Sequence, residues 1–130
     1  MKKGYIDISK LSSPPEKAEF ETALYFAELG NNIVFIPTSL IPNQLRPDIL
    51  MDGIEWEIKC PVGNSKRTIE NNMRKALKQS HNVIFDLRHI RMSEKSCVRQ
   101  LESQFLKRSQ FKKLYIIKKD GSLLKYQKKN

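Results

Sequence analysis

The apolar and polar residues of this 130-residue chain switch between the period of a strand and the period of a helix. Over residues 54–60 every second residue is apolar, which is the two-residue period of a strand with one buried face. Residues 32–36 and 83–87 are short apolar runs, typical of buried strands. Apolar residues recur every three or four positions over residues 14–29, 67–80 and 93–107, which predicts three amphipathic helices.

Two further apolar segments, residues 114–117 and 123–126, flank an Asp-Gly pair and predict a second hairpin near the C-terminus. The predicted order is therefore helix, three strands, helix, strand, helix and two strands. Such an order favours an α/β (α+β) fold, with a mixed central sheet flanked by helices. The length of the chain suits one globular domain over residues 1–130.

The first hairpin has a register that can be predicted from its turn. Asp52-Gly53 is typical of a two-residue type I′ turn, in which both central residues have positive φ. Met51 would then face Ile54, and Asp48 would face Glu57. Two carboxylates placed directly opposite each other repel unless a positive charge lies between them. A bound divalent cation would supply that charge.

Lys59 lies two residues after Glu57 and should share its face of the strand. Hard oxygen ligands suit Mg²⁺ or Mn²⁺, and the carbonyl of Ile58 is a candidate for a further ligand. The ammonium of Lys59 would lie near an attacking water or the charge that develops on a phosphate. The alternative is an ordinary amphipathic hairpin with these side chains in solvent, since Glu-x-Lys is a common pattern.

Glu21 lies at the margin of the apolar stripe of the first predicted helix, which Ser13-Pro14-Pro15-Glu16 is expected to cap and Gly30 to end. A carboxylate there is either an ordinary surface glutamate or a third acid directed at the hairpin. His81 and His89 lie at the ends of a strand, without a partner at metal-ligand spacing, and are interpreted as loop residues.

The positive charge of the chain is concentrated in its last third. Residues 1–87 contain 11 Lys and Arg and 11 Asp and Glu, whereas residues 88–130 contain 13 and 3 and supply the whole net charge of +10. Such asymmetry favours contact with a polyanion, nucleic acid above all, although a solvated surface would have the same composition. We expect seven side chains to contact nucleic acid: Arg46, Ser65, Arg67, Lys75, Gln79, Arg88 and Arg91.

Other function classes are disfavoured. No apolar run is long enough to predict a transmembrane helix, and the first residues lack the apolar segment of a signal peptide, so an exported form would be part of something larger. Cys60 and Cys97 fit neither a disulfide framework nor a zinc site. Neither a glycine-rich phosphate loop nor an aromatic platform for stacking bases is present.

The acidic residues resemble a known motif. Glu21, Pro47-Asp48 and Glu57-Ile58-Lys59, in that order on a helix and two adjacent strands, resemble the PD-(D/E)xK nuclease superfamily, which has a restriction-endonuclease-like fold. Over roughly residues 16 to 118 the chain is similar to the C-terminal tRNase toxin domains of contact-dependent growth inhibition (CdiA-type) proteins. The interval from Asp48 to Glu57 is short for the superfamily, which makes Holliday-junction resolvases less similar.

The resemblance implies a metal-dependent endoribonuclease that cleaves tRNA. Asp48 and Glu57 would bind Mg²⁺ or Mn²⁺, with Zn²⁺ as an alternative; Glu21 would act through a water molecule, and Lys59 would assist the nucleophile or the transition state. An acidic immunity protein would be the partner, and the bacterial cytoplasm the place of action after delivery as the C-terminal domain of a secreted or surface effector. The alternatives are a DNA endonuclease of a mobile element and an inactive nucleic-acid-binding module on the same fold.

Overall fold

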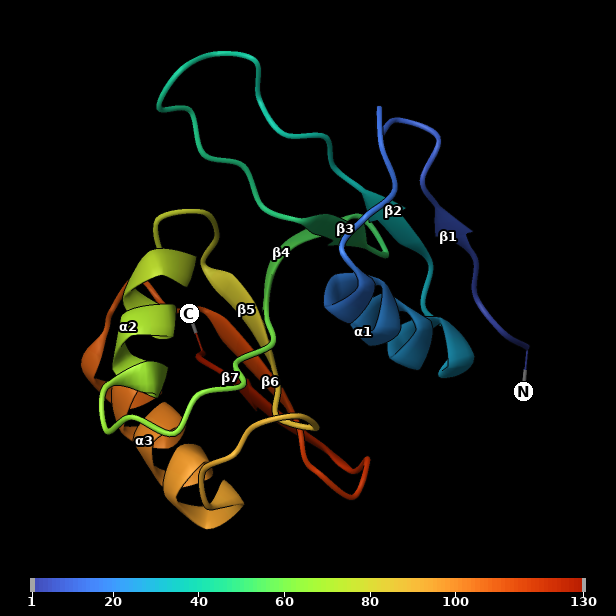
Figure 1. Ribbon diagram of the computed structural model, residues 1–130. Helices are drawn as coiled ribbons and strands as arrows, with labels where there is room; N and C mark the ends of the chain where they lie inside the picture. The colour runs from blue at the N-terminus through green and yellow to red at the C-terminus, as the bar shows by residue number, and fades with distance from the viewer. Residues whose placement is uncertain (1, 130) are drawn as a thin grey trace.

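The computed structural model describes residues 2–129, which form one seven-stranded mixed sheet and three helices (Figure 1). The elements in chain order are β1 (Ile6–Asp7), α1 (Lys17–Glu28), β2 (Ile33–Phe35), β3 (Ile49–Met51), β4 (Ile54–Lys59), α2 (Thr68–Ala76), β5 (Asn82–Asp86), α3 (Glu94–Lys107), β6 (Lys113–Ile117) and β7 (Leu123–Gln127). The predicted order is confirmed apart from β1, which precedes the first predicted helix. No helix in the described residues has the combination of length and apolar character that crossing a membrane requires.

The strands lie in the sheet in the same order as in the chain, from β1 to β7. Neighbours joined by a helix are parallel, namely β1 and β2, β4 and β5, and β5 and β6. Neighbours joined by a loop or turn are antiparallel, namely β2 and β3, β3 and β4, and β6 and β7. The predicted mixed sheet with flanking helices is therefore confirmed.

The helices cover both faces of the sheet (Figure 1). Ala23 and Phe26 of α1 pack against one face, where Trp56 of β4 is the largest buried side chain. Met73 of α2 and Leu101 of α3 pack on the other face, in a second core of buried residues. The sheet thus separates two cores.

Cys60 and Cys97 are both free thiols, as expected.

Helix α1 begins later than the capping pattern predicts. It starts at Lys17, and its N-cap residue Glu16 has extended backbone angles and no side-chain capping bond. The residue before a proline avoids the helical region, and both Ser13 and Pro14 precede prolines, so the helix can only form after them. Gly30 ends the helix as predicted, with a φ of 101° and its N–H donating to the carbonyl of Ala27.

The hairpin of β3 and β4 has the predicted turn and register. Asp52 and Gly53 have φ of 50° and 85°, and Met51 pairs with Ile54. Ile54, expected in the core, is exposed because it lies at the open end of the hairpin. The second hairpin differs: only Gly121 of its Asp-Gly pair has positive φ, and Lys118 N–H donates to the carbonyl of Ser122. Its connection is therefore longer than two residues.

Candidate active site

Asp48 and Glu57 lie opposite each other where β3 begins and β4 passes through the middle of the sheet. The N–H of Asp48 donates to the carbonyl of Trp56 at 3.1 Å, and its Oδ2 accepts a 2.8 Å hydrogen bond from the N–H of Ile58. These two bonds hold the Asp48 side chain over β4, on either side of Glu57. The two carboxyl groups are close enough to share a hydrogen bond when one of them is protonated.

Glu57 is held in an environment unfavourable to its charge. Only 2% of the surface of Glu57 is exposed to solvent. Burial and then the charge of Asp48 raise its pKa to about 8, and burial also raises the pKa of Asp48. The Oε1 atom of Glu57 is buried and accepts no hydrogen bond from any donor in the described residues. A buried carboxylate oxygen without a hydrogen-bond donor is unfavourable unless it binds a proton or a cation.

Lys59 partly offsets the acidic charge. Its Nζ lies 3.3 Å from Oε2 of Glu57, and its side chain is mostly buried. Because Lys59 follows Glu57 by two residues in β4, both side chains leave the same face of the strand. The site thus combines two carboxyl groups with one ammonium group, as the sequence pattern indicates.

Glu19 of α1 is a third acid close to this group, and the sequence analysis missed it. Burial raises the pKa of Glu19 to about 7, with a further contribution from the charge of Asp48. Both side chains line one hollow of about 320 Å³. The signal was available, because Glu19 precedes Ala23 by four residues and Phe26 by seven, which places it on the buried stripe of the helix.

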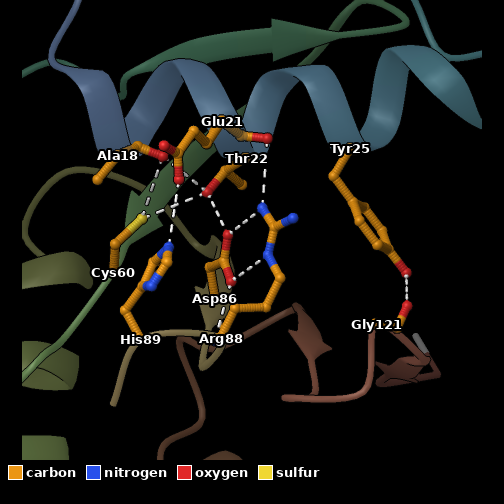
Figure 2. A network of polar contacts seen from close by, with 9 residues as sticks. All are labelled: Ala18, Glu21, Thr22, Tyr25, Cys60, Asp86, Arg88, His89 and Gly121. Carbon is orange, nitrogen blue, oxygen red and sulfur yellow. Dashed lines mark hydrogen bonds and ion pairs between the residues drawn. The ribbon is translucent and has the colours of Figure 1, made fainter.

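Glu21, the residue that the sequence analysis chose, points elsewhere. Successive helix residues turn by about 100°, so residues two apart lie on nearly opposite sides. The carboxylate of Glu21 therefore faces away from Asp48, and its Oε2 lies 3.2 Å from Nε2 of His89 (Figure 2). The structure places Glu19, not Glu21, beside the hairpin acids.

Arg88 belongs to a buried polar network that joins α1 to the end of β5 (Figure 2). Its guanidinium donates to both oxygens of Asp86, at 2.9 and 2.7 Å, and to the backbone carbonyl of Glu21 at 3.3 Å. Oγ1 of Thr22 donates to Asp86 at 2.6 Å. Although burial alone would raise it, these hydrogen bonds keep the pKa of Asp86 below its ordinary value. The guanidinium of Arg88 is thus bound to Asp86 within the fold, and a contact between Arg88 and nucleic acid stays a prediction.

Cys60 lies at the edge of the same network, with its Sγ 3.3 Å from Oγ1 of Thr22. Burial raises the pKa of this thiol to about 12. Since the thiolate is the reactive form of cysteine, this raised pKa disfavours reaction of Cys60 at neutral pH. Cys60 packs against the core that contains Ala23 and Phe26.

The other six side chains expected to contact nucleic acid lie in three places. Arg46 and Gln79 line the hollow that contains Asp48, and Nε2 of Gln79 donates to the Arg46 carbonyl at 3.0 Å. Lys75 is exposed one helical turn before Gln79. Ser65 and Arg67 lie at the opposite end of α2, where the backbone N–H of Arg67 donates to Oγ of Ser65. Arg91 is exposed after β5.

The acids fit a hard cation better than zinc. Asp48 and Glu57 offer carboxylate oxygens, one of them buried without a partner. No three His, Cys, Asp or Glu side chains in residues 2–129 are arranged to hold an ion together, so the rest of a coordination shell would come from carbonyl, water or phosphate oxygens. Mg²⁺ and Mn²⁺ accept such a shell, whereas Zn²⁺ prefers imidazole and thiolate ligands, and neither is part of this set.

The fold and this site define an α+β protein with a buried pair of acids and a lysine on one hairpin. Residues 45–123 match the family model of the contact-dependent growth inhibition CdiA C-terminal domain, and the chain belongs to that family. The matched residues include Asp48, Glu57 and Lys59, whereas α1 and Glu19 lie before them.

A solved structure, that of a CdiA-CT/CdiI toxin and immunity complex from Burkholderia pseudomallei, resembles the whole fold. The TM-score is 0.68 at 19% identity, and the match covers 96% of this chain and 100% of the other. At this identity the likeness shows a common fold. No curated protein has a significantly similar sequence.

Proposed function

We propose that the chain is a metal-dependent endoribonuclease of the PD-(D/E)xK type that cleaves tRNA as a toxin domain. The observation that carries the proposal is the buried pair of Asp48 and Glu57, with an unpartnered Oε1 on Glu57 and the ammonium of Lys59 3.3 Å from its Oε2. Two buried carboxylates that face each other destabilise a fold unless a positive charge lies between them. The order of these residues along the hairpin also fits the PD-(D/E)xK pattern.

Each side chain has a role that its position supports. Asp48 and Glu57 would hold Mg²⁺ or Mn²⁺, and such an ion would supply polarisation of the phosphate and a lowered pKa of a bound water. The N–H of Ile58 donates to the Asp48 side chain. The N–H and the carbonyl of one strand residue point to the same edge of the strand, so the Ile58 carbonyl also points towards Asp48. This carbonyl is therefore suited to be a further ligand. Lys59 stabilises negative charge on the phosphate. Glu19, with a pKa near 7, accepts or returns a proton.

Residues 88–130 carry an excess of ten positive charges, which favours nucleic acid as the substrate. RNA is favoured over DNA because the acidic motif resembles that of tRNase toxin domains. Basic side chains neutralise the phosphates of any nucleic acid, so a DNA endonuclease would use the same chemistry. The third candidate is a module that binds nucleic acid without cutting it. The buried acids favour the two enzymes, since binding alone would not require them.

We also propose an acidic immunity protein as partner. The similar solved structure is a complex of a toxin with its immunity protein, and a cytoplasmic RNase would damage the cell that makes it. A net charge of +10 favours a partner of opposite sign. The proposed place of action is the cytoplasm of a bacterium, reached as the C-terminal domain of a secreted or surface effector.

One experiment tests the enzyme, with total tRNA and a plasmid as substrates in Mg²⁺, Mn²⁺, Zn²⁺ or chelator. We expect cleavage of tRNA in Mg²⁺ or Mn²⁺, none in chelator, and none by Glu57→Gln or Asp48→Asn. Glu55→Gln is the matched control, because Glu55 is exposed on the same strand and should cleave normally. Cleavage that persists in chelator, or in Glu57→Gln, would contradict the proposal, and cleavage of the plasmid alone would favour the DNA endonuclease.

A further inference from the structure

A second hollow adjoins the one that contains Asp48. It lies between residues 10–13 and the connection of β2 to β3, and it has a volume of about 480 Å³. The two hollows have five lining residues in common, Leu11, Ser13, Pro37, Thr38 and Arg46, so they lie side by side, and we call the pair the groove. We call the second hollow the flanking hollow.

The walls of the flanking hollow differ in charge from those of its neighbour. Glu16, Glu19 and Asp48 line the hollow at the active site, whereas no carboxylate lines the flanking hollow. Its two charged side chains, Lys10 and Arg46, are both cations, and neither forms an ion pair in the described part of the chain. The guanidinium of Arg46 has only long contacts, 3.5 and 3.4 Å, with uncharged oxygens. A phosphate would therefore find free positive charge here.

The rest of the wall is apolar or carries hydroxyl groups. Leu40 is 100% exposed and Ile41 60% exposed, on a connection that extends away from the sheet (Figure 1). Thr38 and Ser39 follow Pro37 along the same wall. Aliphatic side chains can insert beside the face of a base, hydroxyls can bond its edge or its ribose, and cations neutralise its phosphate. The volume is within the range of sites for small ligands.

We propose that the flanking hollow binds an unpaired nucleotide of the substrate, next to the phosphate that is cut at Asp48. A base inside a duplex has its faces covered by its neighbours, so only an unpaired or displaced base can meet Leu40 and Ile41. The inference rests on the proposed nuclease function, and it adds that the nucleic-acid substrate binds as a single strand. A protein partner that covers Leu40 and Ile41 is the competing occupant.

Binding can be measured separately from cleavage. The probe is a fluorescently labelled single-stranded RNA 12-mer, and the measurement is anisotropy in chelator at physiological salt. We expect Leu40→Ser/Ile41→Ser to weaken binding by at least about fivefold, since covering aliphatic side chains with a base contributes on the order of 1 kcal/mol or more. Lys10→Gln should also weaken it. Leu106→Ser is the matched control, because Leu106 is 80% exposed on α3, outside the groove, and should bind like the wild type.

Cleavage supplies the second measurement, with bis(p-nitrophenyl) phosphate as a substrate too small to reach the flanking hollow. The double variant should hydrolyse it at the wild-type rate in Mn²⁺ while its KM for RNA rises, and a duplex of the same RNA should bind at least about tenfold more weakly than the single strand. Unchanged RNA affinity in the double variant, or equal affinity for single strand and duplex, overturns the inference and favours a protein partner. A wild type that binds the 12-mer through Leu40 and Ile41 yet cuts nothing in any metal would overturn the nuclease function alone.

Discussion

Ionised Glu57 would be a ligand for a cation, but its charge destabilises the fold. Its folded-state pKa of about 8 lies above the ordinary value of 4.5, chiefly because the side chain is buried and then because Asp48 repels its charge. A raised pKa means that the contribution of Glu57 to stability is complete below pH 4.5 and is lost as the pH rises towards 8. Near pH 8 without a cation, the native state therefore contains a strained acid pair.

Replacing Glu57 should remove this cost. In chelator at pH 8 we expect Glu57→Gln to raise the free energy of unfolding by on the order of 1 to 3 kcal/mol, because a tenfold change in proton affinity corresponds to about 1.4 kcal/mol. The difference should disappear at pH 4, where both side chains are neutral. Urea unfolding at the two pH values measures it, with Glu55→Gln as control. A variant less stable than the wild type at pH 8 would show that Glu57 is not strained.

A cation should relieve the same strain in the wild type. Mg²⁺ at 100 times its dissociation constant should stabilise the wild type at pH 8 by about 2.7 kcal/mol, because the ion binds only the folded state. Glu57→Gln should gain much less, since it lacks one ligand carboxylate. Thermal unfolding with increasing Mg²⁺ is the measurement. Equal gains in the two proteins would place the ion elsewhere.

Substitutions of Glu19 and Glu21 show which side of α1 contributes a proton-transfer group to the active site. Glu19→Gln should lower kcat for RNA by about 10² to 10⁴, the usual contribution of a group that transfers a proton. Glu21→Gln should stay within about twofold of the wild type, because its carboxylate contacts His89. Single-turnover cleavage compares them. The reverse result would restore the role that the sequence analysis gave to Glu21.

At the scale of elements, α1 is held in place by the network of Asp86, Arg88 and Thr22. Since α1 carries Glu19, this network also positions the third acid. Breaking a buried ion pair by removing one partner costs about 3 to 5 kcal/mol, and less here because Arg88 is partly exposed. We expect Arg88→Met to lower the free energy of unfolding by about 2 kcal/mol at pH 7.

Arg91→Met is the matched control, because Arg91 is exposed three residues further along and should change stability by less than about 0.5 kcal/mol. The effect of Arg88→Met should fade as the pH drops below the ordinary Asp pKa of 3.8. The folded-state pKa of Asp86 is lowered, so its stabilisation is present above that value and is lost as Asp86 becomes protonated. Chemical unfolding from pH 7 to pH 3 shows both effects, and equal losses in the two variants would exclude the anchoring role.

The same elements show how far sequence reasoning could reach. The register of β3 and β4 was predictable, because Asp52-Gly53 fixes the turn and the turn fixes every opposed pair. β1 was not, since two residues are too few to show an alternation. The choice of Glu21 over Glu19 followed from assigning Leu24 to the buried stripe of the helix, whereas Leu24 is exposed and Phe26 is buried. The anchoring network joins Asp86 to Thr22, which are 64 positions apart, and no local pattern records such a bond.

Over the whole molecule, positive charge is concentrated on the later elements. Lys112 and Lys128 lie together where β7 pairs with β6, and their backbones are joined by a 3.0 Å hydrogen bond. Lysines on an edge strand also discourage pairing with another chain, so their presence alone does not show binding. Salt distinguishes the two roles, because only phosphate contacts release counterions.

If the later elements contact RNA, the logarithm of the binding constant should fall linearly with the logarithm of salt concentration. Replacing Lys112 and Lys128 by Gln should reduce that slope by about 1 for each of the two lysines that binds a phosphate. Filter binding from 50 to 400 mM salt measures it, with Lys2→Gln as control. A slope unchanged in the double variant would assign these lysines to solubility and to protection of the sheet edge.

The order of the strands in the sheet, which repeats the order of the chain, has a consequence for how the protein assembles. Each new strand adds to the edge formed by the segment just before it, so no strand must wait for a distant part of the polypeptide. Contacts close in sequence cost little loop-closure entropy and favour rapid folding. The sheet can therefore grow from either end, one strand at a time.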